Sequence, residues 1–251
     1  MQKCILDRPI LAILVYLSVR YVSREPFNGE PMFIGHYGPA LAAKPIVKPI
    51  PLWLLFVAVQ WLDVCWSALI LLGIEKARIA PGFTQGSPLD LYFMPYTHGL
   101  IGAVALSFVF GIIAVLFVHE RRAAAIAVVA GAVFSHWLLD LVVHMPDLPL
   151  IDNSLKVGFG LWRWMWISLP LELVTMIAGA AVYARAVPSK TRFGDAALWL
   201  FVAIMVAVEL YGSFGPPPAS PAAEALTALL AYGLLALLAG AVDGFRGTTR
   251  G

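Results

Sequence analysis

Three ionisable side chains recur at a four-residue spacing within one apolar stretch of the sequence. His136, Asp140 and His144 stand at positions i, i+4 and i+8, and the apolar run that contains them starts near Ala123. On an α-helix this spacing places the three side chains close to one face, with a drift of roughly 40° per step. Ionisable groups are costly in lipid and usually face the protein interior or a wet cavity. Two imidazoles and a carboxylate on one stripe therefore predict a metal site.

Other histidines and acids lie in or beside apolar segments and can reach the same stripe. His98 opens one such segment, Asp63 lies in the middle of another, and His36 lies in a short one. Imidazole and carboxylate ligands suit zinc, manganese or iron, and a catalytic centre keeps one coordination position open for water. We therefore expect a divalent metal, zinc first with manganese or iron as alternatives. The expected ligands are His36, Asp63, His98, His136 and Asp140.

Two further carboxylates, Glu172 and Glu209, also lie within apolar segments. Either glutamate could act as the catalytic general base or hold a ligand histidine in place. His144 stands where its helix meets the membrane interface, so we expect it to be an ordinary solvated histidine, and His119 likewise. The plain alternative for all these ionisable residues is a hydrogen bond or ion pair that only fixes helix packing.

The composition indicates an integral membrane protein. Of the 251 residues 61% are hydrophobic and only 13% are charged, about half the charged fraction of a soluble domain. The apolar residues come in runs of membrane length. The net charge of +2, without a basic block, argues against nucleic-acid binding. The two cysteines, Cys4 and Cys65, do not imply a disulfide framework.

The order of apolar runs predicts an all-α fold, a polytopic transmembrane helical bundle of about six to seven spans. Segment 9–22 is short for a span and either crosses with help from its flanks or lies at the interface. Segment 32–43 is shorter still and contains glycine, so it is a candidate re-entrant half-helix buried in protein. Full spans are expected at 52–74, 97–118, 123–143, 166–187 and 222–242, a shorter span at 196–211, and loops at 75–95 and 144–163.

The whole chain is expected to form a single membrane domain. Residues 1–31 form an N-terminal segment and loop, 32–147 the core of the metal site, and 148–251 additional transmembrane helices. If Arg121 and Arg122 face the cytoplasm, most of the 17 Lys and Arg residues also lie on that side, as membrane insertion favours. The candidate ligands then converge nearer the non-cytoplasmic side.

Four short motifs carry a resemblance to a known family. They are FIGHYGPAL with His36, QWLDVCW with Asp63, PYTHGLIG with His98, and SHWLLD with His136 and Asp140. This dispersed pattern resembles the membrane-bound metal-dependent hydrolases of the YdjM-like family, over roughly residues 32–147. The resemblance implies metal-dependent hydrolysis, in a family whose substrates are mostly unassigned.

The chain departs from the family pattern at two places. Asp63 lacks the second acid that usually lies nearby, and residues 93–95 stand where the family usually has another histidine. Fewer ligands favour one metal ion over two, or a site that has lost catalysis.

The sequence thus predicts a hydrolase of a bacterial inner (plasma) membrane, in which metal-activated water cleaves an ester, phosphoester or amide bond. The expected substrate is a membrane-associated small molecule or lipid. The lipid bilayer surrounds the protein, and the sequence leaves the oligomeric state open. One alternative is a small proton- or ion-coupled transporter, although the chain is short and shows no inverted repeat. Another is an accessory subunit whose polar residues only pair helices.

Overall fold

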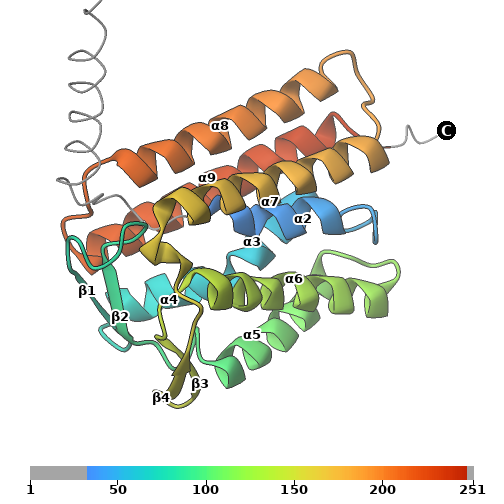
Figure 1. The fold of residues 1–251 in the computed structure, drawn as a ribbon. Coiled ribbons are helices and arrows are strands. Elements are labelled where there is room, and N and C mark those ends of the chain that lie inside the picture. The colour runs from blue at the N-terminus through green and yellow to red at the C-terminus, as the bar shows by residue number, and fades with distance from the viewer. Residues whose placement is uncertain (1–32, 248–251) are drawn as a thin grey trace, which may run out of the picture.

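The computed structural model describes residues 33–247, a helical protein with two short β-hairpins (Figure 1). Segment 9–22 and the start of segment 32–43 lie outside the described residues. The α-helices are α2 (Tyr37–Ala43), α3 (Leu52–Val59), α4 (Trp61–Leu71), α5 (Leu100–Ile113), α6 (Arg122–Val143), α7 (Met165–Ala186), α8 (Gly194–Phe214) and α9 (Pro221–Gly244). Short 3₁₀-helices are η1 (Ile34–His36), η2 (Ala114–Leu116) and η3 (Leu161–Arg163). Helices α7, α8 and α9 lie together on one side, α5 and α6 on the other, and α2 and α3 between them (Figure 1).

Four helices, α6 to α9, are long and apolar enough to cross a membrane. The bent pair α3 and α4 makes up to five, and α5 with η2 is shorter, so the described residues do not reach the expected six to seven spans. Large apolar side chains cover the outer faces of these helices: Leu230 is 75% exposed and Leu237 is 74% exposed. Such a surface suits lipid better than water, because apolar side chains gain nothing from facing water.

The expected span over 52–74 is not one continuous helix, because the helix breaks at Gln60. Helices α3 and α4 meet there at an angle of 55°. The backbone of Gln60 leaves the helical region, at φ −108° and ψ 7°, and its buried side chain donates a hydrogen bond to the carbonyl of Phe33. The bend places Asp63 in the first turn of α4, with its side chain directed into the protein.

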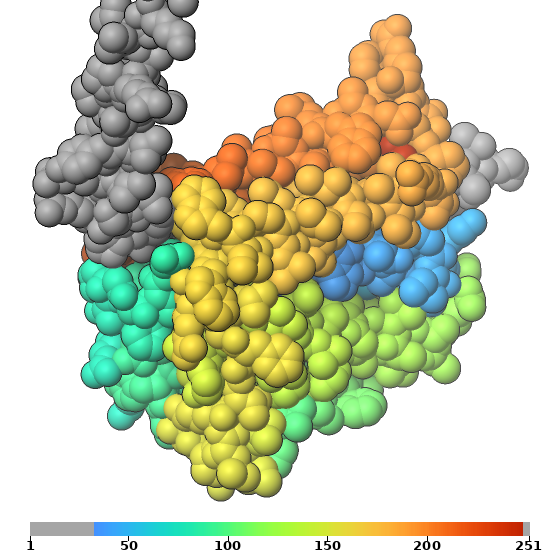
Figure 2. All heavy atoms as spheres, in the orientation of Figure 1, coloured from blue at the N-terminus to red at the C-terminus, as the bar shows by residue number. Residues whose placement is uncertain are grey.

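The segments expected to be loops contain two antiparallel hairpins, which correct the all-α prediction to a mostly α-helical fold. The first pairs β1 (Lys76–Ile79) with β2 (Leu89–Phe93), and the second pairs β3 (Leu148–Ile151) with β4 (Ser154–Val157). The side chains of Asn153 and Lys156 donate hydrogen bonds to the carbonyl of Tyr92, so the hairpins touch. Their surfaces adjoin in the space-filling view, teal beside yellow (Figure 2).

Helix α2 packs tightly against α7 through two glycines. A Cβ atom on Gly179 would meet the backbone of Gly38, and a Cβ on Gly38 would meet the backbone of Thr175. This close approach seats η1 and α2, and with them His36, in the centre of the helical bundle.

A cluster of charges ties the helices together at the end where α2, α7 and α9 finish. The Lys44 ammonium donates to Asp243, and Tyr183 donates to the other oxygen of the same carboxylate. Lys190 and Arg246 line the same small cavity as Lys44. These three basic residues therefore lie together at one end of the molecule.

Candidate metal centre

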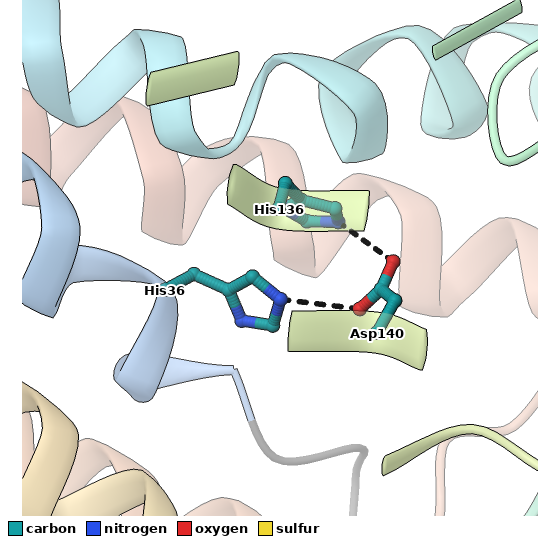
Figure 3. Close-up of side chains that lie close together, drawn as sticks. All are labelled: His36, His136 and Asp140. Atoms are coloured by element: carbon teal, nitrogen blue, oxygen red, sulfur yellow. Dashed lines mark hydrogen bonds and ion pairs between the residues drawn. The ribbon is translucent and has the colours of Figure 1, made fainter. Parts of the chain in front are cut away.

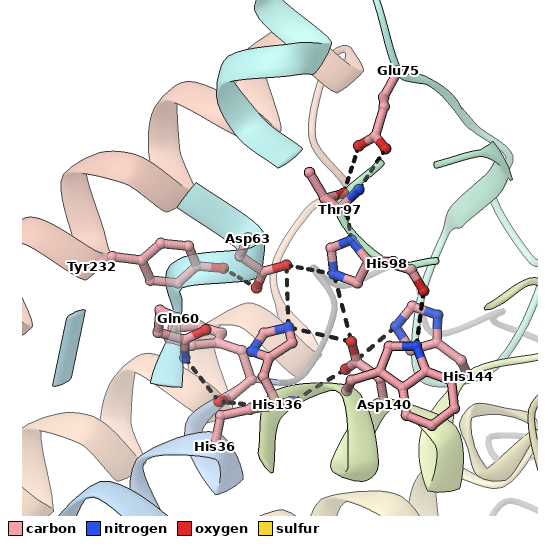
Figure 4. Close-up of polar contacts among 12 residues, drawn as sticks. His36, Gln60, Asp63, Glu75, Thr97, His98, His136, Asp140, His144 and Tyr232 are labelled. Carbon is pink, nitrogen blue, oxygen red and sulfur yellow. Dashed lines mark hydrogen bonds and ion pairs between the residues drawn. The ribbon is translucent and has the colours of Figure 1, made fainter. Parts of the chain in front are cut away.

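Four of the five histidines of the chain meet two aspartates in the interior (Figure 4). Each of the four imidazole side chains is at most 5% exposed. They come from η1, the turn before α5, α6, and the turn after α6, while Asp63 comes from α4. The six residues are His36, His98, His136, His144, Asp63 and Asp140. The fifth histidine, His119, is exposed, as expected.

Asp140 lies at the centre of the cluster, and each of its carboxylate oxygens faces two imidazoles. Oδ1 lies 3.1 Å from Nε2 of His36 and 3.6 Å from Nε2 of His144. Oδ2 lies 3.2 Å from Nε2 of His136 and 3.5 Å from Nε2 of His98. Figure 3 shows His36 and His136 reaching Asp140 from two different segments of the chain.

Asp63 approaches two of the same imidazoles from the other side. Its Oδ1 lies 3.2 Å from Nε2 of His98 and 3.5 Å from Nε2 of His136, and its Oδ2 accepts a 2.8 Å hydrogen bond from the Tyr232 hydroxyl. Two triads have ligand atoms within 4.8 Å of one another: His36 with His136 and Asp140, and Asp63 with His98 and His136. All five residues predicted as metal ligands therefore come together.

The other ring nitrogen, Nδ1, is held in place in His36 and His136 by backbone carbonyls. Nδ1 of His136 lies 2.7 Å from the carbonyl oxygen of Val59, and Nδ1 of His36 lies 3.1 Å from that of Phe33. A carbonyl oxygen only accepts hydrogen bonds, so Nδ1 must carry the proton in both rings. In the neutral imidazole, Nε2 then presents a lone pair to the cluster.

His98 and His144 are held in the same way by side chains. Nδ1 of His98 lies 2.9 Å from the Thr97 hydroxyl, which itself donates a 2.6 Å hydrogen bond to Glu75. The hydroxyl therefore accepts from His98. Nδ1 of His144 lies 3.0 Å from the carboxylate of Asp147. This pattern, with Nδ1–H bound to an acceptor and Nε2 free, is the usual arrangement of metal-ligating histidines.

The Nε2 lone pairs and the carboxylate oxygens repel one another unless a cation or protons lie between them. Protons are one solution: burial lowers the pKa of His144, which stands beyond the end of α6, but the carboxylates of Asp140 and Asp147 raise this pKa by more. A divalent cation is the other. Ligand atoms bound tetrahedrally to zinc at about 2.0–2.2 Å lie about 3.4 Å apart. The separations of 3.1 and 3.6 Å from Asp140 Oδ1 to Nε2 of His36 and of His144 are close to that spacing, and the ligand atoms of each triad all lie within 4.8 Å of one another.

The expectation that His144 is solvated is wrong, and Glu75 was not identified from the sequence. His144 is only 4% exposed and faces Asp140, because the chain turns inward after α6 and the ring packs on Trp162 with 4.1 Å between ring centroids. Its i+8 position on the stripe was the available signal. Glu75 is 1% exposed and also accepts the backbone N–H groups of residues 96 and 97. It lies in a polar stretch, so no local pattern marks it as part of the site.

Glu172 and Glu209 hold the backbone that leads into His36. Glu172 accepts a hydrogen bond from the N–H of Gly35, and Glu209 accepts 3.3 Å hydrogen bonds from the N–H groups of Phe33 and Ile34. The first N–H groups of a helical segment lack internal partners and favour negative charge nearby. These contacts are those of positioning residues; a general-base role for either glutamate stays a prediction.

A cavity of about 180 Å³ opens onto the cluster. His36, Asp63, His98, Asp140 and His144 line its polar end. Most of the remaining wall is apolar and comes from β2, α4, α8 and α9, including Trp66, Leu89, Leu91, Met94, Val208, Ala228 and Ala231. The cavity thus lies between the imidazoles and carboxylates on one side and residues of the membrane-length helices α8 and α9 on the other.

The chain is thus a helical protein in which membrane-length helices surround a buried cluster of histidines and aspartates whose ligand atoms lie close enough together to hold a metal ion. Comparison of the chain with protein-family models, with curated proteins and with solved structures finds no match in any of the three. The resemblance to the YdjM-like hydrolases therefore rests on the four sequence motifs alone.

Proposed function

We propose that the protein is an integral membrane hydrolase that depends on a divalent metal, zinc first. The observation that carries the proposal is the common orientation of four imidazoles, each with Nδ1 bound to an acceptor and Nε2 directed at a carboxylate. Helix packing alone does not require four rings from separate segments to share this orientation. Metal binding does, because each ring must direct one nitrogen at the metal while the other is held by an acceptor.

The chemistry of such a site is hydrolysis of an ester, phosphoester or amide. A cation held here supplies Lewis-acid chemistry, lowering the pKa of water toward about 7 and polarising the scissile group. Among the chain's own groups, the Asp63 side chain is 21% exposed and lines the cavity, whereas that of Asp140 is 4% exposed. Asp63 is therefore the cluster carboxylate that faces the cavity most openly, with Tyr232 holding its second oxygen.

The substrate we propose is a membrane-associated small molecule or lipid. The apolar part of the wall, which includes Trp66, Leu89 and Leu91, can bury a hydrocarbon portion while a polar group reaches the cluster. The distribution of Lys and Arg residues favours a site nearer the non-cytoplasmic side of a plasma membrane.

The test is metal analysis of the purified full-length protein, combined with hydrolysis assays on ester, phosphoester and amide substrates that carry an acyl chain. His136→Ala and Asp140→Ala should lose both metal and activity. His119→Ala, which changes an exposed histidine far from the cluster, should keep both. A wild-type protein without a bound transition metal, and variants of unaltered stability, would overturn the proposal.

A further inference from the structure

We propose that the cluster binds two divalent cations bridged by the carboxylate of Asp140, and not the single ion that the sequence motifs favour. This inference rests on the proposed function, because both need a metal at the cluster. It goes further in assigning each ligand to one of two positions and in giving His144 a role as a ligand.

The assignment follows from the two oxygens of Asp140. Oδ1 faces His36 and His144, at 3.1 and 3.6 Å, and Oδ2 faces His136 and His98, at 3.2 and 3.5 Å. No imidazole is nearest to both oxygens in these contacts, so the carboxylate divides the four rings into two pairs. A carboxylate that presents one oxygen to each pair is suited to bridge two metal ions.

The two positions differ in the number of protein ligands. The first has Oδ2 of Asp140, His98 and His136, and also Oδ1 of Asp63, which lies 3.2 and 3.5 Å from these two imidazoles. Four protein ligands on one ion would leave no coordination position open. The second position has Oδ1 of Asp140, His36 and His144, three protein ligands that leave a coordination position open. The position with the open coordination site is the one suited to bind water or substrate.

The surrounding charge also favours two cations. Besides Asp63 and Asp140, two further carboxylates stand next to the ligand histidines. Glu75 binds Thr97 beside His98, and Asp147 binds His144. Buried charges are costly unless they are compensated, and one divalent cation leaves this acidic shell in excess. A second cation offsets it.

The experiment measures metal stoichiometry on the full chain in lipid nanodiscs, after loading with Zn²⁺ and removal of loosely bound ions. The wild type should hold two ions per chain. His144→Ala and His36→Ala should each lower the content to one, because they change only the three-ligand position. His119→Ala should keep two, and circular dichroism checks that each variant is folded.

A second measurement separates a bridged pair from two unrelated ions. Protein loaded with Mn²⁺ should give an exchange-coupled electron paramagnetic resonance spectrum, which His144→Ala converts to that of an isolated ion. A folded wild type that holds one ion, or two without coupling, would overturn the bridged pair and leave the proposed function standing. A folded wild type that holds no ion would overturn both.

Discussion

Nδ1 of His136 lies 2.7 Å from the carbonyl oxygen of Val59, the last residue of α3. The last carbonyls of a helix lack partners within it, and here one of them fixes the orientation of an imidazole. The same break in the chain begins α4, whose first turn places Asp63 3.5 Å from Nε2 of that ring. The bend at Gln60 therefore positions both groups that contact the His136 ring, the Val59 carbonyl at Nδ1 and Asp63 at Nε2.

The contact from Glu75 through Thr97 to His98 predicts a loss of metal affinity when its charge is removed. Glu75→Gln keeps the shape of the side chain but replaces one accepting oxygen with an amide donor, so the Thr97 hydroxyl loses its acceptor. We expect metal affinity to fall about 10- to 100-fold with unchanged helix content. Competition with a chelator of known affinity measures the change.

The control for this prediction is Glu120→Gln, an exposed glutamate next to His119 and outside the cluster. It should leave affinity unchanged. Equal metal affinities in Glu75→Gln and the wild type would show that the hydrogen bonds from Glu75 through Thr97 do not orient His98.

The apolar wall of the cavity predicts that a large side chain there blocks substrate but not metal. Ala231 of α9 lines the cavity, so Ala231→Trp fills space in front of the cluster. Hydrolysis of substrates with an acyl chain should fall about 10-fold or more, since small displacements of a bound substrate cost large factors in rate. Metal content should stay at the wild-type level.

Leu230→Trp is the matched control, because the neighbouring Leu230 is 75% exposed on the outer face of the same helix. It should retain full activity. If Ala231→Trp and Leu230→Trp hydrolyse these substrates at the same rate, the substrate does not bind along α9.

The close packing of α2 on α7 predicts opposite effects for two glycine substitutions. Gly179→Ala places a methyl group against the backbone of Gly38, and overpacking of this kind costs about 1–3 kcal/mol. Displacement of α2 also moves His36, so metal should bind more weakly. Gly233→Ala in α9 meets no atom within 4 Å and should stabilise the protein by up to about 1 kcal/mol.

Thermal unfolding of both variants, with and without added metal, measures these effects. A Gly179→Ala protein as stable as Gly233→Ala would show that the two helices do not need their close approach.

Much of the helical framework and the identity of five candidate ligands could be predicted from the sequence. Long apolar runs and the i, i+4 pair of His136 and Asp140 are local patterns, and local periodicity determines which residues share a helix face. The hairpins and the break at Gln60 could not be read in this way. Each depends on contacts with segments distant in the chain, such as the bond from Gln60 to Phe33.

The residues alone predict a protein rich in membrane-length helices, with His136 and Asp140 on one helix face, because hydrophobicity and helical spacing act over a few residues. The three-dimensional packing was needed to show that His144 turns inward, that Glu75 stands behind His98, and that Glu172 and Glu209 hold the backbone before His36. Those features depend on where helices bend and pack. The contacts that determine the packing join residues far apart in the sequence, so a local pattern does not reveal them.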